Sequence, residues 1–258
     1  MSGFRSALFC YLNFPKAFAL DNKTMSDAGW LAPSCLGNNF TISSWQEVLR
    51  QSKQVPLVFL VTRNPFDRFV SLYMDKCVAW RRTRGSQEPV FDNGRCGCEK
   101  NLYCFLKKIY GLLLSLQPDY NMFLPPSKRF MSKSPFERYL IKHFAPMSWY
   151  CGTQQFLNSM HTIHLDMSNK ERMAEKYDEI LTLANVTKQQ RLYIRTELLR
   201  ELPSYATWNQ KGRTDVENEL LSNATLLELF LQLYLHDFMI FKYDFPTPHS
   251  TSISLCMK

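Results

Sequence analysis

The sequence predicts an α/β fold of three layers, in which a central parallel sheet is flanked by helices. The unbroken apolar run PLVFLVT (56–62) fits a strand buried on both faces, and it leads directly into a helix. A second strand-like segment, HTIHLD (161–166), precedes a long helix. Strands that alternate with long helices form parallel sheets. Ligands of such sheets bind beyond the carboxyl ends of the strands, and Arg63 lies at one such end.

Size and charge narrow the class of protein. A chain of 258 residues with 45% hydrophobic and 14% aromatic residues is expected to fold as one packed domain spanning residues 1–258. The net charge of +8 favours an anionic partner, such as a nucleotide, acidic lipid, acidic polysaccharide or nucleic acid. We do not expect nucleic acid, because the chain shows no recognised module and no stripe of aromatic and basic residues.

The elements follow in order from local signals. Residues 4–13 read as a short helix or strand end, 101–116 as a helix, and 81–101 and 118–135 as irregular segments. After the 56–62 strand, Asn64 suits the N-cap and Pro65 the first position of a helix. Further helix starts are predicted by capping boxes. These boxes are Ser44-x-x-Glu47, Ser168-x-x-Glu171, Thr187-x-x-Gln190 and Thr214-x-x-Glu217.

The strand end at residue 63 has the ingredients of a phosphate site. The helix that follows would direct unpaired N–H groups and its positive dipole end beyond the strand. Arg63 adds a planar cation suited to bidentate phosphate binding, while Arg68 and Ser71 lie one and two turns into the helix. The alternative is that Arg63 pairs with Asp67 and that Ser71 faces solvent.

Among five histidines, His143 is the candidate general base, because it lies in a polar turn between helical segments. The alternative is a histidine that caps the preceding helix. His161 and His164 lie on the second predicted strand, and no third ligand is spaced to complete a metal site, so we expect none. The basic run AWRRTRG (79–85) either binds an acidic polysaccharide or forms a solvated helix end.

The segment RNPFDRFVSLY (63–73) resembles the 3′-phosphate-binding motif of sulfotransferases, Arg-Asp-Pro-x-x-Arg-x-x-Ser-x-[Tyr/Phe]. The chain is similar over about residues 4–245 to Golgi carbohydrate sulfotransferases of the HNK-1/chondroitin 4-sulfotransferase type, and most to their nematode members. HFAPMSW (143–149), SYATWNQKGR (204–213) and LLELFLQLYLHDFMIFKYD (226–244) resemble further segments of that family.

The resemblance implies a P-loop-like fold and transfer of sulfate from 3′-phosphoadenosine 5′-phosphosulfate (PAPS) to a sugar hydroxyl. The acceptor would belong to a glycosaminoglycan such as chondroitin or to a glycoprotein glycan. The implied nucleotide site comprises Arg63, Asn64, Arg68, Ser71, Thr207, Lys211 and Arg213. Asn64 replaces the usual Asp but is an equally good N-cap. Tyr205 replaces a histidine, which removes any contact made by that side chain.

The front of the chain departs from the family pattern. The family binds the phosphosulfate with a Pro-Lys-x-x-[Ser/Thr] loop between a strand and a helix, whereas Pro15-Lys16 is followed by Ala-Phe-Ala-Leu. We therefore interpret this segment as the helix after the loop, and expect the first strand and the loop to precede Met1. The alternative function is a non-catalytic remnant that binds acidic glycans or nucleotide.

Cysteines and glycosylation signals predict the secretory lumen. Four N-x-[ST] sequons begin at residues 22, 39, 185 and 223, and eight cysteines accompany them. Cys77, Cys96, Cys98 and Cys104 could bind zinc or form disulfides, and we expect disulfides. The chain shows no signal peptide and no membrane span. The resemblance implies a Golgi membrane protein with a lumenal catalytic domain, whose anchor would precede Met1.

Overall fold

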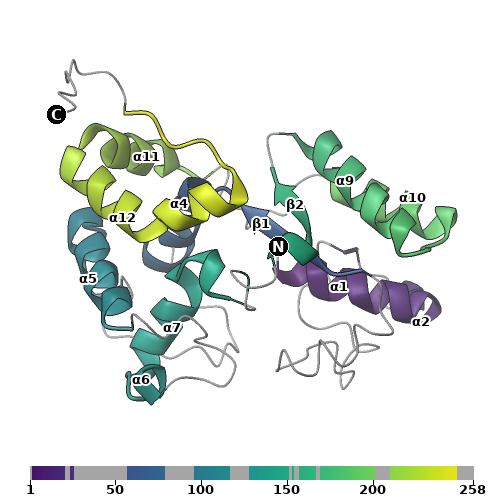
Figure 1. Ribbon diagram of the computed structural model, residues 1–258, viewed down its shortest axis with the longest axis horizontal. Helices are drawn as coiled ribbons and strands as arrows, with labels where there is room; N and C mark the ends of the chain where they lie inside the picture. Colours follow the sequence, from purple (N-terminus) through teal and green to yellow (C-terminus); the bar gives the residue numbers. More distant parts are fainter. Residues whose placement is uncertain are drawn as a thin grey trace. The chain divides into compact units, whose positions relative to one another are not determined.

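The computed structural model describes residues 2–20, 24–25, 57–78, 96–116, 128–150, 153, 157–166, 169–200 and 210–248, as drawn in Figure 1. The chain divides into two compact units. The first unit comprises Met1–Thr62 and Phe156–Ala206, and the second comprises Arg63–Gln155 and Thr207–Lys258.

The first unit combines helices with a small sheet. Its described elements are α1 (Ser2–Asn13), α2 (Pro15–Leu20), β1 (Phe59–Arg63), η4 (Leu157–Ser159), β2 (His161–Leu165), α9 (Lys170–Leu183) and α10 (Lys188–Leu199). The last residue of β1, Arg63, is the first of the second unit. β1 and β2 pair in a parallel two-stranded sheet. The amide of His161, at the start of β2, donates to the carbonyl of Val58 just before β1 (2.9 Å), so the two strands start side by side.

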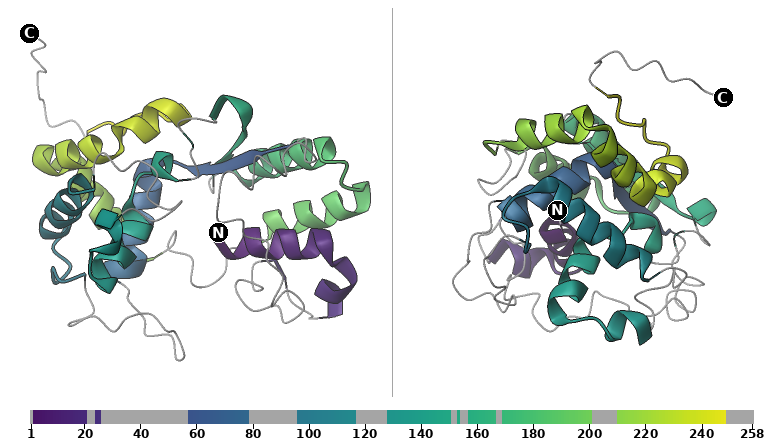
Figure 2. Two further views of the ribbon diagram at one scale, coloured as in Figure 1. Left: turned by 60° about the horizontal axis from the view of Figure 1, so that its bottom comes forward. Right: turned by 90° about the vertical axis from the view of Figure 1, so that its left-hand side faces the viewer.

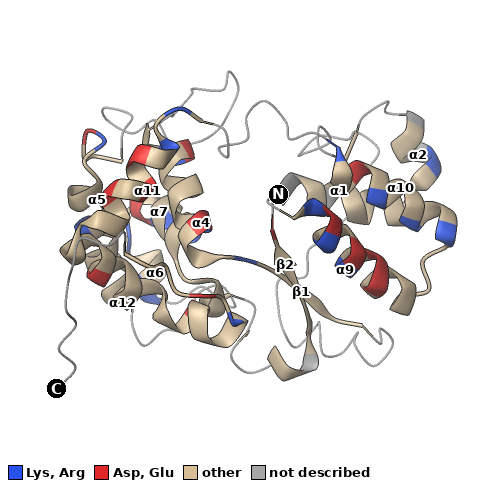
Figure 3. Ribbon diagram, turned by 90° about the horizontal axis from the view of Figure 1, so that it is seen from above, with Lys and Arg blue, Asp and Glu red and all other residues tan. Residues whose placement is uncertain are grey.

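α1 lies beside the α9–α10 pair, as the two views of Figure 2 indicate, and aromatic side chains join them. Tyr11 lies 4.6 Å from Tyr193 between ring centroids, and Phe4 meets Tyr177 edge-on. Figure 3 shows acidic residues on α9 and basic residues on α10. These charges pair across the two helices, as in the 2.7 Å contact between Arg191 and Asp178.

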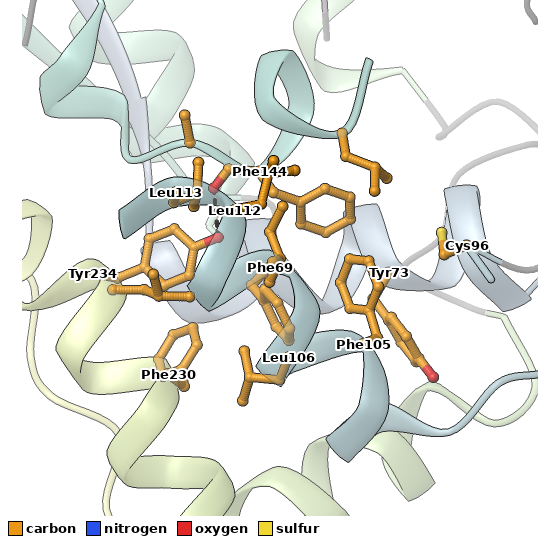
Figure 4. Close-up of a cluster of buried hydrophobic side chains, with 14 of the residues drawn as sticks. Phe69, Tyr73, Cys96, Phe105, Leu106, Leu112, Leu113, Phe144, Phe230 and Tyr234 are labelled. Atoms are coloured by element: carbon orange, nitrogen blue, oxygen red, sulfur yellow. Dashed lines mark hydrogen bonds between the residues drawn. The ribbon is translucent and has the colours of Figure 1, made fainter. Parts of the chain in front are cut away.

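The second unit is helical. Its described elements are α4 (Pro65–Tyr73), a π-helical turn η2 (Met74–Val78), α5 (Leu102–Leu114), α6 (Lys128–Met131), α7 (Pro135–Phe144), η3 (Met147–Trp149), α11 (Arg213–Ser222) and α12 (Ala224–Phe241). Phe69 on α4 lies at the centre of its core (Figure 4). The Phe69 ring contacts Phe105 of α5, Phe144 of α7 and Phe230 of α12, so one side chain joins four helices.

α12 is the core helix of the second unit. Its length and apolar composition would also suit a membrane span, because both kinds of helix are long and apolar. Here Leu226, Phe230, Tyr234 and Phe238 are buried in the same cluster as Phe69. α12 therefore packs against α4, the helix that carries the predicted phosphate motif.

The strands and most helices fall where the sequence predicts them. The helix at 101–116 is α5, the strand at 161–166 is β2, and residues 4–13 are helical. β1 begins later than the predicted 56–62 strand and includes Arg63. The predicted α/β class is confirmed in its coarse form. The expected larger central sheet is not present in the described ranges, which contain only β1 and β2. The helix predicted from Ser44 lies outside them.

Two of the predicted capping boxes are wrong. The N-cap of α9 is Asn169, one residue after the predicted Ser168. The Asn169 side chain accepts from the amide of Arg172 (3.0 Å). α11 begins at Arg213 rather than after Thr214, since Gly212 precedes it in a left-handed conformation (φ 87°) that ends the preceding turn. The Thr187 cap of α10 is confirmed.

The predicted disulfides are present. Cys77 joins Cys96, and Cys98 joins Cys104, so the end of the π-helical turn is tied to the start of α5. This pairing replaces the alternative zinc site. The Tyr73 hydroxyl donates to the Lys100 carbonyl (2.7 Å) and so fixes the turn of residues 96–100, just before α5, to α4. Cys10 is also disulfide-bonded.

Candidate functional site

Asn64 sets the start of α4 as the sequence predicts. Its side-chain oxygen accepts from the amides of Phe66 (2.9 Å) and Asp67 (3.4 Å), and its carbonyl accepts from Arg68 (2.9 Å). Pro65 contributes no N–H. The prediction of unpaired N–H groups at this helix start is therefore wrong, because the cap already satisfies them. An anion here would be held by guanidinium groups and by the helix dipole.

Arg63 ends β1 as a half-buried cation. Among the residues that the structure describes, its guanidinium forms no hydrogen bond and no ion pair. Burial lowers the pKa of Arg63, and the positive charges of Arg213 and Arg68 lower it further, whereas Asp67 opposes the change. A guanidinium stays protonated in proteins, so Arg63 keeps its positive charge. An anion would supply the compensating charge.

Asp67 forms an ion pair with Arg213. The alternative prediction from the sequence, a pair between Asp67 and Arg63, is therefore wrong. The Arg213 guanidinium donates to Asp67 (2.9 Å) and to Glu217 (2.7 Å), and the Arg213 residue is only 5% exposed. This ion pair ties the start of α11 to the first turn of α4. It also removes Asp67 as a direct partner for Arg63.

Ser71 and Arg68 continue the motif along α4. Ser71 is 9% exposed, so the alternative of a solvent-facing serine is wrong. Arg68 is half-buried and donates from its guanidinium to the carbonyl of His143 at 2.6 Å. The phosphate motif and the predicted base are thereby joined by a direct contact within one unit.

His143 lies in the last turn of α7 and not, as predicted, in a turn between helices. Tyr139, one turn earlier on α7, fixes its ring. The His143 Nδ1 lies 2.7 Å from the Tyr139 carbonyl, and the two rings pack with centroids 4.3 Å apart. A carbonyl oxygen only accepts, so Nδ1 carries the hydrogen of this contact, and Nε2 holds the lone pair of the neutral ring. His143 therefore contacts the backbone of its own helix, as in the alternative in which it caps that helix. The same contact keeps the tautomer that a base acting through Nε2 needs.

The remaining predicted residues are placed as follows. Lys211 is exposed just before α11, and Thr207 and Tyr205 lie outside the described residues. In the first unit, Lys16 is exposed at the start of α2. His161 and His164 are exposed on β2. The described part of the chain contains no group of three His, Cys, Asp or Glu side chains that could hold a metal ion.

Sequence reasoning missed two buried polar residues of α12. The Tyr234 hydroxyl donates to the Phe144 carbonyl at 2.6 Å, as Figure 4 shows. The carboxylate of Asp237, which is 0% exposed, accepts from the amides of Met147 and Ser148. An acidic residue within the apolar run of α12 was the available signal, since a buried charge needs a partner.

Comparison with known proteins decides the family. The profile of the sulfotransferase family matches residues 1–244. The chain belongs to the sulfotransferase family. The chain is also similar to the carbohydrate sulfotransferase chst-1 of Caenorhabditis elegans, to which it is 26% identical over 187 residues.

A further relative of this sulfotransferase is an uncharacterized C. elegans protein, 26% identical over 251 residues, or 95% of the chain. The alignment with chst-1 covers 72% of the chain. The chain spans 65% of the length of the uncharacterized relative and 52% of that of chst-1. No solved structure matches it.

Proposed function

We propose that this sulfotransferase moves a sulfuryl group from PAPS to a hydroxyl of a carbohydrate. The acceptor would be a glycosaminoglycan such as chondroitin, or a glycoprotein glycan, as in the HNK-1/chondroitin 4-sulfotransferase type. Family membership and the name of one relative, a carbohydrate sulfotransferase, support the reaction class. The excess of positive charge in the chain favours an acidic polysaccharide as acceptor.

The observation that carries the proposal is the guanidinium of Arg63, which has no ionic partner among the described residues and lies in the field of two further arginines. In this proposal Arg63 and Ser71 hold the 3′-phosphate of the nucleotide. Asn64 acts indirectly, because its cap fixes the start of α4. We assign the rest of the nucleotide site to Arg68, Arg213, Lys211 and Thr207. A planar guanidinium matches the oxygens of a phosphate bidentately.

His143 serves as the general base. Its Nε2 accepts the proton of the sugar hydroxyl as that oxygen bonds to sulfur. The bond from sulfur to the bridging phosphate oxygen breaks, and its electron pair stays on the 5′-phosphate. The products are the sulfated sugar and adenosine 3′,5′-bisphosphate. The contact between Nδ1 and Tyr139 holds the tautomer on which this step depends.

The proposed compartment is the Golgi lumen, where disulfides persist. The two bridges around α5 and the exposed sequon residues Asn185 and Asn223 are compatible with that setting. The sequons at residues 22 and 39 lie outside the described ranges. We extend the proposal to the whole chain as one domain with a P-loop-like fold.

The reaction is tested by transfer of radiolabelled sulfate from PAPS to desulfated chondroitin and to a glycoprotein glycan. We expect transfer by the wild type and a loss of about 10²- to 10⁴-fold in His143→Gln, as for removal of a general base. His161→Gln, an exposed histidine of the first unit, should keep full activity. Equal rates in the two variants would remove His143 from the reaction.

A second candidate function is nucleotide or glycan binding without transfer. It is favoured by Lys16, which lies exposed at the junction of two helices and not in a loop between a strand and a helix. The described residues therefore supply no lysine-bearing phosphosulfate loop. Binding of adenosine 3′,5′-bisphosphate with no sulfate transfer to either acceptor would support this candidate over the first.

A further inference from the structure

The segment of residues 143–148 is here called the 143–148 turn. It comprises the last two residues of α7, beginning with the proposed base His143, then the link Ala145–Pro146, and the first two residues of the short helix η3. Each of the last four carbonyls of α7 lacks a partner within the helix. The Ile141 carbonyl accepts from the amide of Ala145 (2.9 Å) and from the hydroxyl of Tyr150 (3.5 Å). The other three accept from side chains. Tyr150 donates to Lys142 (2.7 Å), Arg68 to His143 and Tyr234 to Phe144.

The far end of the turn is held by a single carboxylate. Asp237 of α12 accepts from the amide of Met147 at 2.6 Å and from that of Ser148 at 2.9 Å. Asp237 is completely buried, and a buried carboxylate is unfavourable unless it is hydrogen-bonded or paired. Here the two amides and the nearby positive charge of Arg68 compensate it.

Asp237 and Tyr234 leave α12 one turn apart, so both project from one face of a rigid helix toward the same turn. Tyr234 is also fully buried, and its hydroxyl meets the Phe144 carbonyl from the core (Figure 4). The turn is therefore fixed at both ends by α12. Its third anchor, Arg68, comes from the phosphate-motif helix α4.

We propose that Asp237 and Tyr234 are positioning residues for sulfate transfer. Both residues fix the 143–148 turn, and Arg68 joins the same turn to α4. Together these contacts hold the His143 ring in one position relative to the phosphate-motif helix. The inference rests on the proposed function for its effect on rate. It predicts that these residues act on the chemical step and leave nucleotide binding at Arg63 unchanged.

The test compares Asp237→Asn, Tyr234→Phe and the control Glu228→Gln, an exposed acid on the same helix. We expect kcat to fall by about 10- to 100-fold in the two test variants, because small misplacement of a reacting group has costs of that order. The dissociation constant for adenosine 3′,5′-bisphosphate should stay within about twofold. The control should match the wild type in both measurements.

Two readouts do not depend on activity. Amide hydrogen exchange at Met147 and Ser148 should accelerate in Asp237→Asn, because an asparagine side chain offers one acceptor oxygen in place of two. Nitrogen-15 spectra of His143 should change from one tautomer to a mixture. A wild type without sulfate transfer would defeat the proposed function, and these two readouts would still decide the positioning role.

Several results would overturn the proposal. Wild-type exchange and wild-type kcat in both test variants would show that α12 does not position the turn. Equal losses in kcat and in nucleotide affinity would show a general disturbance of the site. Loss of the folded state in both variants, followed by circular dichroism, would leave only a role in stability.

Discussion

The guanidinium of Arg68 donates to the backbone carbonyl of His143 across 2.6 Å. This contact joins two segments that are 75 residues apart in sequence, the helix with the phosphate motif and the turn with the proposed base. A cation at the C-terminal end of α7 also interacts favourably with that helix dipole. The contact gives Arg68 a structural role within the motif. It also places the proposed nucleotide site and the proposed base in one unit.

The cap of α4 predicts a graded response at Asn64. Replacing Asn64 with Ala removes an acceptor for two amides and should lower the free energy of unfolding by about 1 kcal/mol. Asn64→Asp should retain both stability and nucleotide affinity, because aspartate caps equally well. Urea denaturation of the three proteins measures their free energies of unfolding, and calorimetric titration of adenosine 3′,5′-bisphosphate measures their affinities. A destabilised Asn64→Asp with an unaffected Asn64→Ala would contradict the capping role.

Phe69 should be among the most sensitive positions of the second unit. Its side chain is 1% exposed and meets aromatic rings of α5, α7 and α12. Phe69→Ala should cost about 3–5 kcal/mol, and Phe69→Leu clearly less, since more volume is retained. Thermal melts followed by circular dichroism provide the measurement. Leu114→Ala, at a 40% exposed position of α5, is the matched control and should cost far less.

The two disulfides should contribute unequally. Cys77–Cys96 spans 19 residues of sequence and Cys98–Cys104 spans 6. The entropy of loop closure gives about 3 kcal/mol for the longer loop and about 2 kcal/mol for the shorter one. Denaturation of the paired Cys-to-Ala variants compares them. Non-reducing mass spectrometry of secreted protein should find both pairs, and free thiols at all four positions would refute the pairing.

Asp237 predicts a pH effect on stability. Burial raises the pKa of its carboxyl, while hydrogen bonds from Ser148 and Met147 and the charge of Arg68 oppose the rise. A group whose pKa is raised by folding contributes full stability below its unfolded pKa, about 3.9, and loses it as pH rises through the folded pKa. The wild type should therefore gain stability relative to Asp237→Asn on acidification from pH 7 toward pH 4.

Thermal melts of both proteins across that pH range measure the difference, because the asparagine amide does not titrate. If the wild type instead lost stability relative to the variant on acidification, the hydrogen bonds would outweigh burial. The carboxylate form would then be the favoured one in the folded protein.

Local signals in the sequence predicted the elements that matter most at the site. Asn64 and Pro65 marked the start of α4, because capping and the fixed φ of proline act within one turn. The apolar run PLVFLVT located β1, and the segment HTIHLD located β2. The predicted N-caps Ser168 and Thr214 were wrong, because a neighbouring residue serves as the N-cap instead. This residue is Asn169 for α9 and Gly212 for α11.

Pairings between distant segments were not predictable from the sequence. Asp67 lies four residues from Arg63, which made their pairing the obvious alternative, but its partner Arg213 is 146 residues away. The roles of Tyr234 and Asp237 depend on where α12 packs against the end of α7. Such contacts are set by tertiary packing, and one sequence without relatives carries no local signal for them.

Calorimetric titration of adenosine 3′,5′-bisphosphate into the wild type and Arg63→Ala tests the central claim most directly. Loss of a charge-assisted phosphate contact should weaken binding by about 1.5–3 kcal/mol, which is about 10- to 150-fold. Arg63→Lys should give an intermediate loss, because it keeps the charge without the planar fork. Arg172→Ala, an exposed arginine of α9, should bind as the wild type does. Equal affinity in wild type and Arg63→Ala would contradict the account.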